Sequence, residues 1–177
     1  RPALSDFEAK NGKKGVMISA VDLLKGIAVG AGMKVIEVEG ANGGLHTNYE
    51  GKAMAAVEAL CNEDYDFAYI HVEAPDEMGH QGSLERKLQA VENLDKKVIR
   101  VVKDQLEARG EDFRLLVLPD HPTPIRLRTH VGEPVPYLLY DSTKRKASDL
   151  LYNEKDAKKS GVYIKNGYEM IDHLFEK

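Results

Sequence analysis

The chain has 177 residues, 42% of them hydrophobic, which is enough to bury the core of one domain, so we expect residues 1–177 to form a single domain. Its 25 basic and 29 acidic side chains leave a net charge of -4 without any basic block, which excludes a typical nucleic-acid-binding protein. The one cysteine, Cys61, excludes an intramolecular disulfide and suits the reducing cytoplasm. No apolar run approaches the roughly 20 residues that a membrane span requires, so we expect a soluble protein with no membrane partner.

The first third of the chain alternates strand and helix signals. Residues 15–20 form an apolar run typical of a short buried strand, and residues 21–32 then carry apolar side chains at helical spacing up to glycines that can end a helix. Residues 34–38 are rich in β-branched side chains and alternate in polarity, which predicts a second strand. Glycines at 40–44 then mark a loop.

A second helix and a buried strand are predicted next. Thr47 or Asn48 is suited to cap a helix over residues 49–60, which are rich in alanine. Residues 67–72, FAYIHV, are too apolar for a strand with one face in water. We therefore expect a central strand that is covered on both faces.

The second half of the chain begins with the longest predicted element. Ser83 is suited to cap a helix that ends near Gly110. The apolar stripe of this helix consists of Leu84, Leu88, Val91, Leu94, Val98, Val101 and Leu106. Residues 113–119 and 135–140 predict two further strands, and Asn166 is suited to cap a short C-terminal helix.

The alternation of strands and helices predicts an α/β fold, with a mostly parallel sheet and helices on both faces. Ligands of such sheets bind outside the carboxyl ends of the strands. The glycines of the first helix lack the strand-to-turn spacing of a pyrophosphate-binding loop, so no nucleotide site is predicted.

Two predicted strand ends deliver metal-ligating side chains to the same edge of the sheet. Asp76 and His80 follow the strand at 67–72 and are four residues apart, a spacing that lets both face one ion. Asp120 and His121 follow the next buried strand, where flanking prolines end the extended conformation. His130 lies farther along the same loop.

Carboxylates with neutral imidazoles are ligands for zinc or manganese, and five such groups exceed what one tetrahedral ion with an open position requires. Two ions are the natural interpretation. A metal pair about 3.5 to 4 Å apart orients a phosphoryl group and activates an oxygen nucleophile. The pattern therefore points to phosphoryl transfer or phosphate-ester hydrolysis.

Structural roles compete with these interpretations. An aspartate after a strand is commonly a turn former, and a lone histidine is usually structural. We expect His71 to lie within its strand with a packing role, and His46 and His173 to face solvent. Glu73 and Glu77 are candidates for orienting the ligands, although solvated carboxylates are an equal alternative.

Lys25 lies on the first predicted long helix, where a solvated lysine is the simplest interpretation. Its functional alternative is a cation for a substrate phosphate or carboxylate. A non-catalytic α/β module with structural histidines also remains an alternative for the whole chain.

Four segments together resemble cofactor-independent phosphoglycerate mutase of the archaeal type, in the alkaline phosphatase superfamily. They are MISAVDLLKGIAVGAGMKVIEV (17–38), HVEAPDEMGH (71–80), QAVENLDKKV (89–98) and LPDHPTPIRLRTHVGEPVPYLLY (118–140). The resemblance runs from about residue 2 to the C-terminus. Other phosphohydrolases and phosphomutases of that superfamily share the metal motifs and remain alternatives.

The resemblance implies an enzyme with two divalent metal ions, manganese in the first place and zinc, cobalt or magnesium as alternatives. It implies that one ion is held by Asp76, His80 and His130 and the other by Asp120 and His121. Lys25 approximates the family's substrate-binding lysine. In the family, a serine takes the phosphoryl group from 3-phosphoglycerate and returns it to the 2-hydroxyl of glycerate, a step of glycolysis and gluconeogenesis.

The family's nucleophilic serine, a further metal-binding aspartate and the arginines of an inserted cap domain match no segment of this sequence. We therefore expect the chain, which begins at Arg1, to be the C-terminal part of the catalytic domain, with the N-terminal half of the same polypeptide as its missing partner. We also expect it to be inactive alone. Self-association through a sheet edge left open is a further hypothesis.

Overall fold

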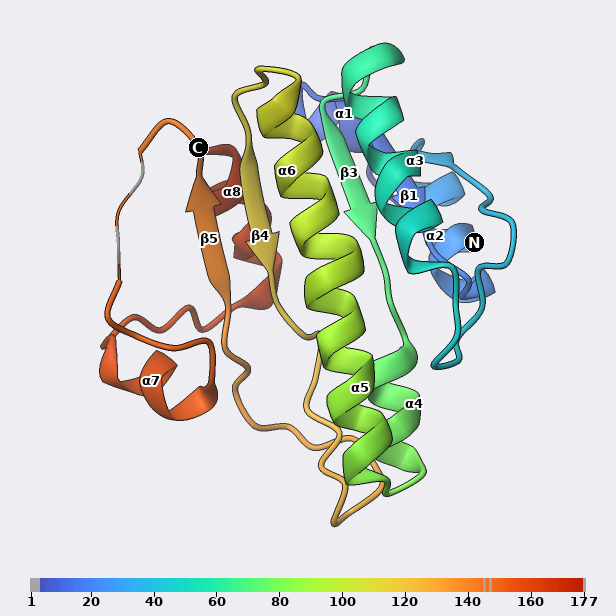
Figure 1. Ribbon diagram of the computed structural model, residues 1–177. Helices are drawn as coiled ribbons and strands as arrows, with labels where there is room; N and C mark the ends of the chain where they lie inside the picture. The colour runs from blue at the N-terminus through green and yellow to red at the C-terminus, as the bar shows by residue number, and fades with distance from the viewer. Residues whose placement is uncertain (1–3, 145, 147, 177) are drawn as a thin grey trace.

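The computed structural model describes residues 4–144, 146 and 148–176 (Figure 1). The strands are β1 (Gly15–Ile18), β2 (Lys34–Val35), β3 (Phe67–Ile70), β4 (Arg114–Val117) and β5 (Leu138–Asp141). The α-helices are α1 (Phe7–Asn11), α2 (Asp22–Gly30), α3 (Tyr49–Asn62), α4 (Ala74–His80), α5 (Leu84–Leu94), α6 (Arg100–Ala108), α7 (Glu154–Lys159) and α8 (Met170–Phe175). A π-helical turn, η1 (Asp95–Ile99), joins α5 to α6, and a 3-10 turn, η2 (Gly167–Glu169), precedes α8.

Two sheets form in the described part of the chain. The first has the order β2-β1-β3 and is parallel throughout, with Val16 opposite Ala68 and Lys34. This confirms the α/β class with a parallel sheet flanked by helices. The second sheet pairs β4 with β5 in antiparallel fashion, with Leu115 opposite Tyr140. The reversal follows because residues 118–137 contain no helix that would carry the chain back to the other edge, as a parallel connection requires.

The strand at 67–72 was expected to be a central strand covered on both faces, and its central position is wrong. Within the described residues β3 pairs only with β1, and β4 pairs only with β5. The helices α5 and α6 cross in front of the space between β3 and β4 (Figure 1). Tyr69 of β3 remains 37% exposed. Among the described residues β3 is therefore an edge strand, because its second edge has no partner strand.

The predicted long helix exists, and its two halves differ in burial. Ser83 caps α5 by accepting a hydrogen bond from the Arg86 amide. Toward the C-terminal end the stripe is buried at Val98 and Leu106. Its first three members are exposed, Leu84 by 59%, Leu88 by 56% and Val91 by 48%. The difference arises because α5 extends past the ends of the strands, where no sheet covers it (Figure 1).

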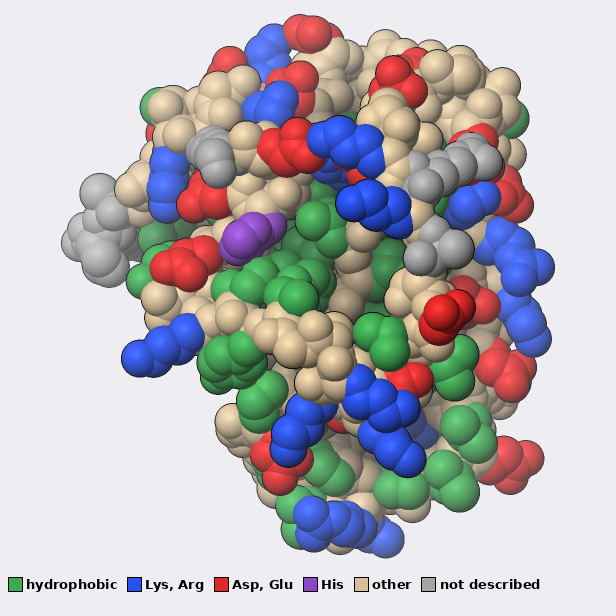
Figure 2. All heavy atoms as spheres, turned by 90° about the vertical axis from the view of Figure 1, so that its left-hand side faces the viewer, with side chains coloured by type: hydrophobic (Ala, Val, Ile, Leu, Met, Phe, Trp, Pro, Cys, Tyr) green, Lys and Arg blue, Asp and Glu red, His purple; other side chains and the backbone are tan. Residues whose placement is uncertain are grey.

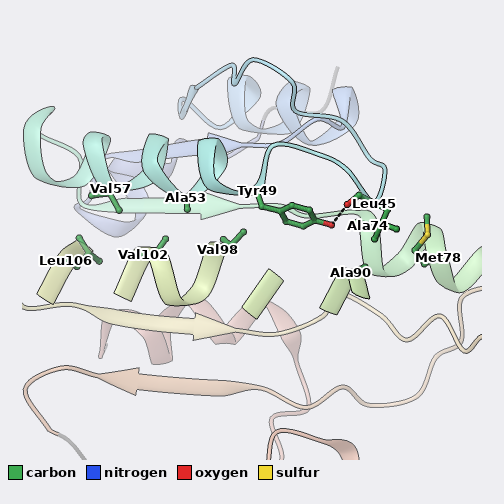
Figure 3. Packing of buried hydrophobic residues seen from close by; sticks show 10 residues of the cluster. All are labelled: Leu45, Tyr49, Ala53, Val57, Ala74, Met78, Ala90, Val98, Val102 and Leu106. Carbon is green, nitrogen blue, oxygen red and sulfur yellow. Dashed lines mark hydrogen bonds between the residues drawn. The ribbon is translucent and has the colours of Figure 1, made fainter. Parts of the chain in front are cut away.

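The main core lies between α3 and the long helix and continues to α4 (Figure 3). Its members are Leu45, Tyr49, Ala53, Val57, Ala74, Met78, Ala90, Val98, Val102 and Leu106. Ala53 and Val57 of α3 face the long helix. The Tyr49 hydroxyl donates to the Leu45 carbonyl at 2.9 Å, so its polar end is satisfied. Asn48 caps α3 as predicted, accepting from the Gly51 amide.

A smaller aromatic cluster covers the opposite side of β3. Phe67 stacks on Phe7 of α1, with ring centroids 5.2 Å apart, and meets Phe175 of α8 edge-on at 5.6 Å. Ile70 of the same strand packs against the main core. Because Phe67 and Ile70 point to opposite faces of a strand, both faces of β3 are in contact with helices.

The remaining elements differ from prediction in length more than in kind. The strand predicted at 34–38 is reduced to β2. Asn166 precedes η2 and not α8, and its side chain makes no capping bond to a helix amide but donates from Nδ2 to Glu169 Oε1 at 2.9 Å, so the predicted cap is wrong. Within the described ranges no helix is long and apolar enough to cross a membrane.

The face formed by β5 and α8 has a hollow with hydrophobic side chains in its floor and charged side chains around it (Figure 2). A pocket of about 240 Å³ is lined there by Arg114, Asp141, Lys144 and Glu176, among others. Arg114 and Lys144 each pair with both Asp141 and Glu176. These cations are therefore already neutralised by carboxylates.

Candidate metal centre

The predicted metal-ligating residues gather beyond the ends of β3 and β4, which point the same way (Figure 1). A pocket of about 170 Å³ lies there, and its wall includes His71, Glu73, Asp76, Asp120 and His121. The carboxyl ends of parallel strands in α/β proteins are the usual place for ligands. The position of the pocket therefore agrees with the sequence-based expectation.

Helix α4 presents Asp76 and His80 on one side. Glu73 precedes this helix, and its carbonyl oxygen accepts from the amides of Asp76 at 2.9 Å and Glu77 at 3.1 Å. Pro75 suits the first turn, where its missing amide hydrogen is not needed. His80 Nε2 lies 3.4 Å from Asp76 Oδ2, as the four-residue spacing predicted.

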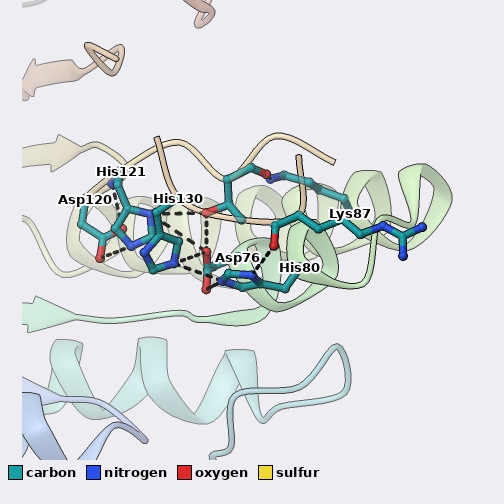
Figure 4. Close-up of polar contacts among 8 residues, drawn as sticks. Asp76, His80, Lys87, Asp120, His121 and His130 are labelled. Atoms are coloured by element: carbon teal, nitrogen blue, oxygen red, sulfur yellow. Dashed lines mark hydrogen bonds and ion pairs between the residues drawn. The ribbon is translucent and has the colours of Figure 1, made fainter. Parts of the chain in front are cut away.

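His130 completes a compact trio with these two side chains (Figure 4). Its Nε2 atom lies 3.1 Å from His80 Nε2 and 3.3 Å from Asp76 Oδ1. Nitrogen and oxygen ligands about 2.0–2.2 Å from one ion lie about 2.8–3.6 Å from each other at octahedral or tetrahedral angles. Each of the three distances lies in this range, with Asp76 Oδ2 facing His80 and Asp76 Oδ1 facing His130.

The protonation of His80 also suits a metal ligand. Its Nδ1 atom lies 2.9 Å from the carbonyl oxygen of Arg128. A carbonyl only accepts hydrogen bonds, so Nδ1 is the donor, and in the neutral ring Nε2 then offers its lone pair toward Asp76 and His130. Arg128 adopts a left-handed backbone with φ 55, uncommon for a residue other than glycine.

Asp120 and His121 lie on the other side of the trio. His121 Nε2 is 3.4 Å from Asp120 Oδ2, while its Nδ1 is 4.0 Å from Asp76 Oδ1. The His121 and His130 rings are 3.7 Å apart between centroids. Asp76, His121 and His130 thus also offer ligand atoms within 4.8 Å of one another. The five side chains form one continuous cluster in which Asp76 and His130 contact both halves.

Sequence reasoning missed Thr123 and Lys87. Thr123 is only 4% exposed; its hydroxyl donates to Asp76 Oδ1 and lies 3.3 Å from His121 Nδ1. Its carbonyl accepts from Lys87 Nζ at 2.6 Å, and burial lowers the pKa of that lysine. The only available signal was a threonine between two prolines beside the predicted ligands.

Gly79 allows this approach of α4 to the loop after β4. A Cβ atom there would lie 2.6 Å from the Thr123 carbonyl oxygen, closer than atoms come in real structures. Glycine is therefore needed at this position for the loop to reach Asp76.

Lys25 does not line the pocket wall and pairs with surface carboxylates. Its Nζ donates to Glu37 at 2.8 Å, a hydrogen bond that raises the pKa of Lys25. Among the other candidates, Glu77 is exposed at the pocket, and Glu73 is buried beside Lys52.

His71 lies just past the end of β3 rather than within it. Its amide still donates to the Ile18 carbonyl at 2.8 Å, and its ring stacks near Tyr69. His46 and His173 are exposed, in agreement with their predicted solvent-facing positions.

Comparison with known proteins bears on this cluster directly. The family model described as the metalloenzyme superfamily matches residues 2–172. The chain belongs to the metalloenzyme superfamily. Membership of this superfamily agrees with a cluster of aspartates and histidines at the ends of β3 and β4, and it implies divalent metal ions.

Relatives of this superfamily member carry one recurring name. The chain is 45% identical to a protein of Geobacter sulfurreducens named probable 2,3-bisphosphoglycerate-independent phosphoglycerate mutase, over 99% of this chain and 44% of that protein. It is 48% identical to the 2,3-bisphosphoglycerate-independent phosphoglycerate mutase of Methanosarcina mazei, again over 99% and 44%. The resemblance seen in the sequence is confirmed. The chain spans less than half the length of these relatives.

Solved structures support the fold. The PH0037 protein from Pyrococcus horikoshii matches with a TM-score of 0.83 and 28% identity, over 97% of this chain and 51% of that one. A cofactor-independent phosphoglycerate mutase from Thermoplasma acidophilum matches with a TM-score of 0.69 at 23% identity, over 99% of this chain and 40% of that one. The second likeness is evidence for the fold alone.

Proposed function

We propose that this metalloenzyme chain is the metal-binding part of a phosphoglycerate mutase that interconverts 3-phosphoglycerate and 2-phosphoglycerate through a phosphoserine. The observation that carries the proposal is the spacing of Asp76, His80 and His130: the two Nε2 atoms lie 3.1 Å apart, and each lies 3.3 to 3.4 Å from one oxygen of the Asp76 carboxylate. The names of the relatives supply the substrate class.

In this proposal one divalent ion is bound by Asp76, His80 and His130. A second ion takes some of its ligands from Asp120 and His121. Manganese is the proposed physiological metal, since mixed carboxylate and imidazole sites suit it. Two ions bound there would stabilise the charge of a phosphoryl group in transfer. Thr123 would hold the Asp76 carboxylate in place for this role.

The nucleophile comes from outside the chain in this proposal. No serine lines the pocket among the described residues, and the buried Ser19 uses its Oγ to accept from the Val21 amide at 3.0 Å. The remaining part of the polypeptide would supply the serine, a further aspartate and the substrate-binding arginines. Lys25 would contribute a cation to the substrate after leaving Glu37.

A glycolytic role would place the protein in the cytoplasm, where Cys61 stays reduced. Self-association is a related proposal, because β3 and β4 each leave one edge unpaired within the described residues. Light scattering after size exclusion tests it: a monomer that persists at high concentration would refute it.

The main experiment combines metal analysis with an activity assay. We expect the purified chain to bind manganese by titration calorimetry and to produce no 2-phosphoglycerate from 3-phosphoglycerate. Coexpression with the rest of the polypeptide is expected to restore turnover. Turnover by the chain alone would refute the assignment of the nucleophile, and an absence of metal binding would favour a structural role for the histidines.

A further inference from the structure

Lys52 is a charged residue in the main core. It lies on α3 with a fully buried side chain, and its flanking residue Ala53 is likewise buried. Its Nζ atom donates to the His71 carbonyl oxygen at 3.0 Å and to Glu73 Oε2 at 3.1 Å. Both acceptors belong to the short segment that leads from β3 to α4.

This segment determines where α4 begins. The Glu73 carbonyl oxygen accepts from the Asp76 amide in the first turn of α4. Glu73 thus binds Lys52 through its side chain and α4 through its backbone. His80 follows on the same helix. Lys52 is therefore linked through Glu73 to the backbone of Asp76, the first of the residues proposed to bind metal.

The buried ion pair of Lys52 and Glu73 is a poor source of stability for the core. The side chain of Glu73 is only 10% exposed, and its Oε1 atom has no hydrogen-bond partner among the described residues. A buried carboxylate oxygen without a donor is costly. Replacement of buried ion pairs by apolar residues of similar size is often neutral or stabilising. The geometry of the segment, rather than stability, is therefore what the pair provides.

We infer that Lys52 and Glu73 are positioning residues that fix the start of α4, so that Asp76 and His80 stand at metal-binding distance from His130. The inference rests on the proposed metal site. It adds that Lys52 and Glu73, which would not contact the ions themselves, connect this site to the core.

The deciding variant replaces both members, Lys52→Met with Glu73→Leu. Without metal, its thermal unfolding midpoint is expected to equal or exceed that of the unaltered chain. Its manganese affinity by titration calorimetry is expected to fall by about tenfold or more, the size typical of residues that orient ligands. The visible spectrum of the cobalt-loaded chain is expected to change as well, because the coordination geometry shifts.

A matched control replaces the exposed pair Lys34→Met with Glu63→Leu. Lys34 Nζ and Glu63 Oε2 are 2.8 Å apart, at the end of the sheet where β2 starts. This variant changes the same residue types by the same substitutions and is expected to leave manganese affinity and the cobalt spectrum unchanged.

Two single variants keep the test decisive if the double variant does not fold. Glu73→Gln keeps an oxygen that accepts from Lys52 and is expected to retain the affinity of the unaltered chain, whereas Glu73→Ala removes the anchor and is expected to lose about tenfold. Equal losses in both would show that the charge of Glu73 acts on the ions and would overturn the inference. So would full affinity in the double variant. Failure of the unaltered chain to bind metal would instead refute the proposed site, and the inference with it.

Discussion

His80 donates its Nδ1 proton to the backbone carbonyl oxygen of Arg128 across 2.9 Å, and this contact joins α4 to the loop that carries His130. The bond fixes the tautomer of His80 and points Nε2 at Asp76. One side chain thus connects two segments of the chain and offers a lone pair at their junction.

The first prediction follows from that junction. His80→Ala removes a ligand and the contact with Arg128, so manganese affinity should fall by about 100-fold or more, beyond the loss typical of residues that only orient ligands. Titration calorimetry measures it. His173→Ala, which alters an exposed histidine on α8, should bind as the unaltered chain does. An unchanged isotherm for His80→Ala would contradict the assignment.

The second prediction concerns the hydroxyl of Thr123. Thr123→Val keeps the shape of the side chain but removes the hydrogen bond to Asp76, so metal affinity should drop by about tenfold. The control is Thr143→Val, which removes a hydroxyl that donates to Asp141 instead. Equal affinities in the two variants would show that Thr123 has no part in holding Asp76.

The third prediction compares two leucines at opposite ends of the long helical segment. Leu106→Ala empties a site that is 4% exposed against α3 and should lower the free energy of unfolding by about 2–5 kcal/mol. Leu84→Ala, at 59% exposed, should change it by less than about 0.5 kcal/mol. Urea unfolding of both variants tests this, and similar losses would mean that α5 is covered in solution.

The fourth prediction concerns acid stability. Hydrogen bonds from the Thr143 hydroxyl and amide, with help from Arg114, lower the pKa of Asp141 from 3.8 to about 2. A lowered carboxyl pKa contributes stability that is complete above the ordinary value and is lost as pH falls through the folded-state value. The unaltered chain should therefore lose its advantage over Asp141→Asn between about pH 4 and about pH 2. Urea unfolding across that range measures the difference, and a constant gap would refute the coupling.

Much of the fold was predictable because its signals are local. The apolar runs predicted β1 and β4, and the side chains of Asn48 and Ser83 cap the helices that they were expected to cap. The direction of β5 was not predictable, because antiparallel pairing depends on where residues 118–137 lead the chain and not on the residues of the strand itself.

The candidate site was likewise predictable where its signals are local and not where it depends on contacts between distant segments. Asp76 and His80 could be paired from their spacing, and the two strand ends could be brought together from the α/β pattern. The contributions of Thr123, Lys87 and Lys52 could not be foreseen, since each depends on a contact between segments far apart in sequence. A lysine in an alanine-rich helix is ordinarily a surface residue, and only the packing of α3 shows it to be buried.

The contact between His80 and His130 also has a consequence in the unfolded chain. The two residues are 50 positions apart, so an ion that both ligate closes a loop of that length. The unfolded chain does not keep the two ligands together and so loses the ion, which makes the free energy of metal binding part of the free energy of folding. In a sequence with a single cysteine, metal coordination would then be the cross-link between distant parts of the fold. A chelator would destabilise the folded chain as a reductant destabilises a protein held by disulfides.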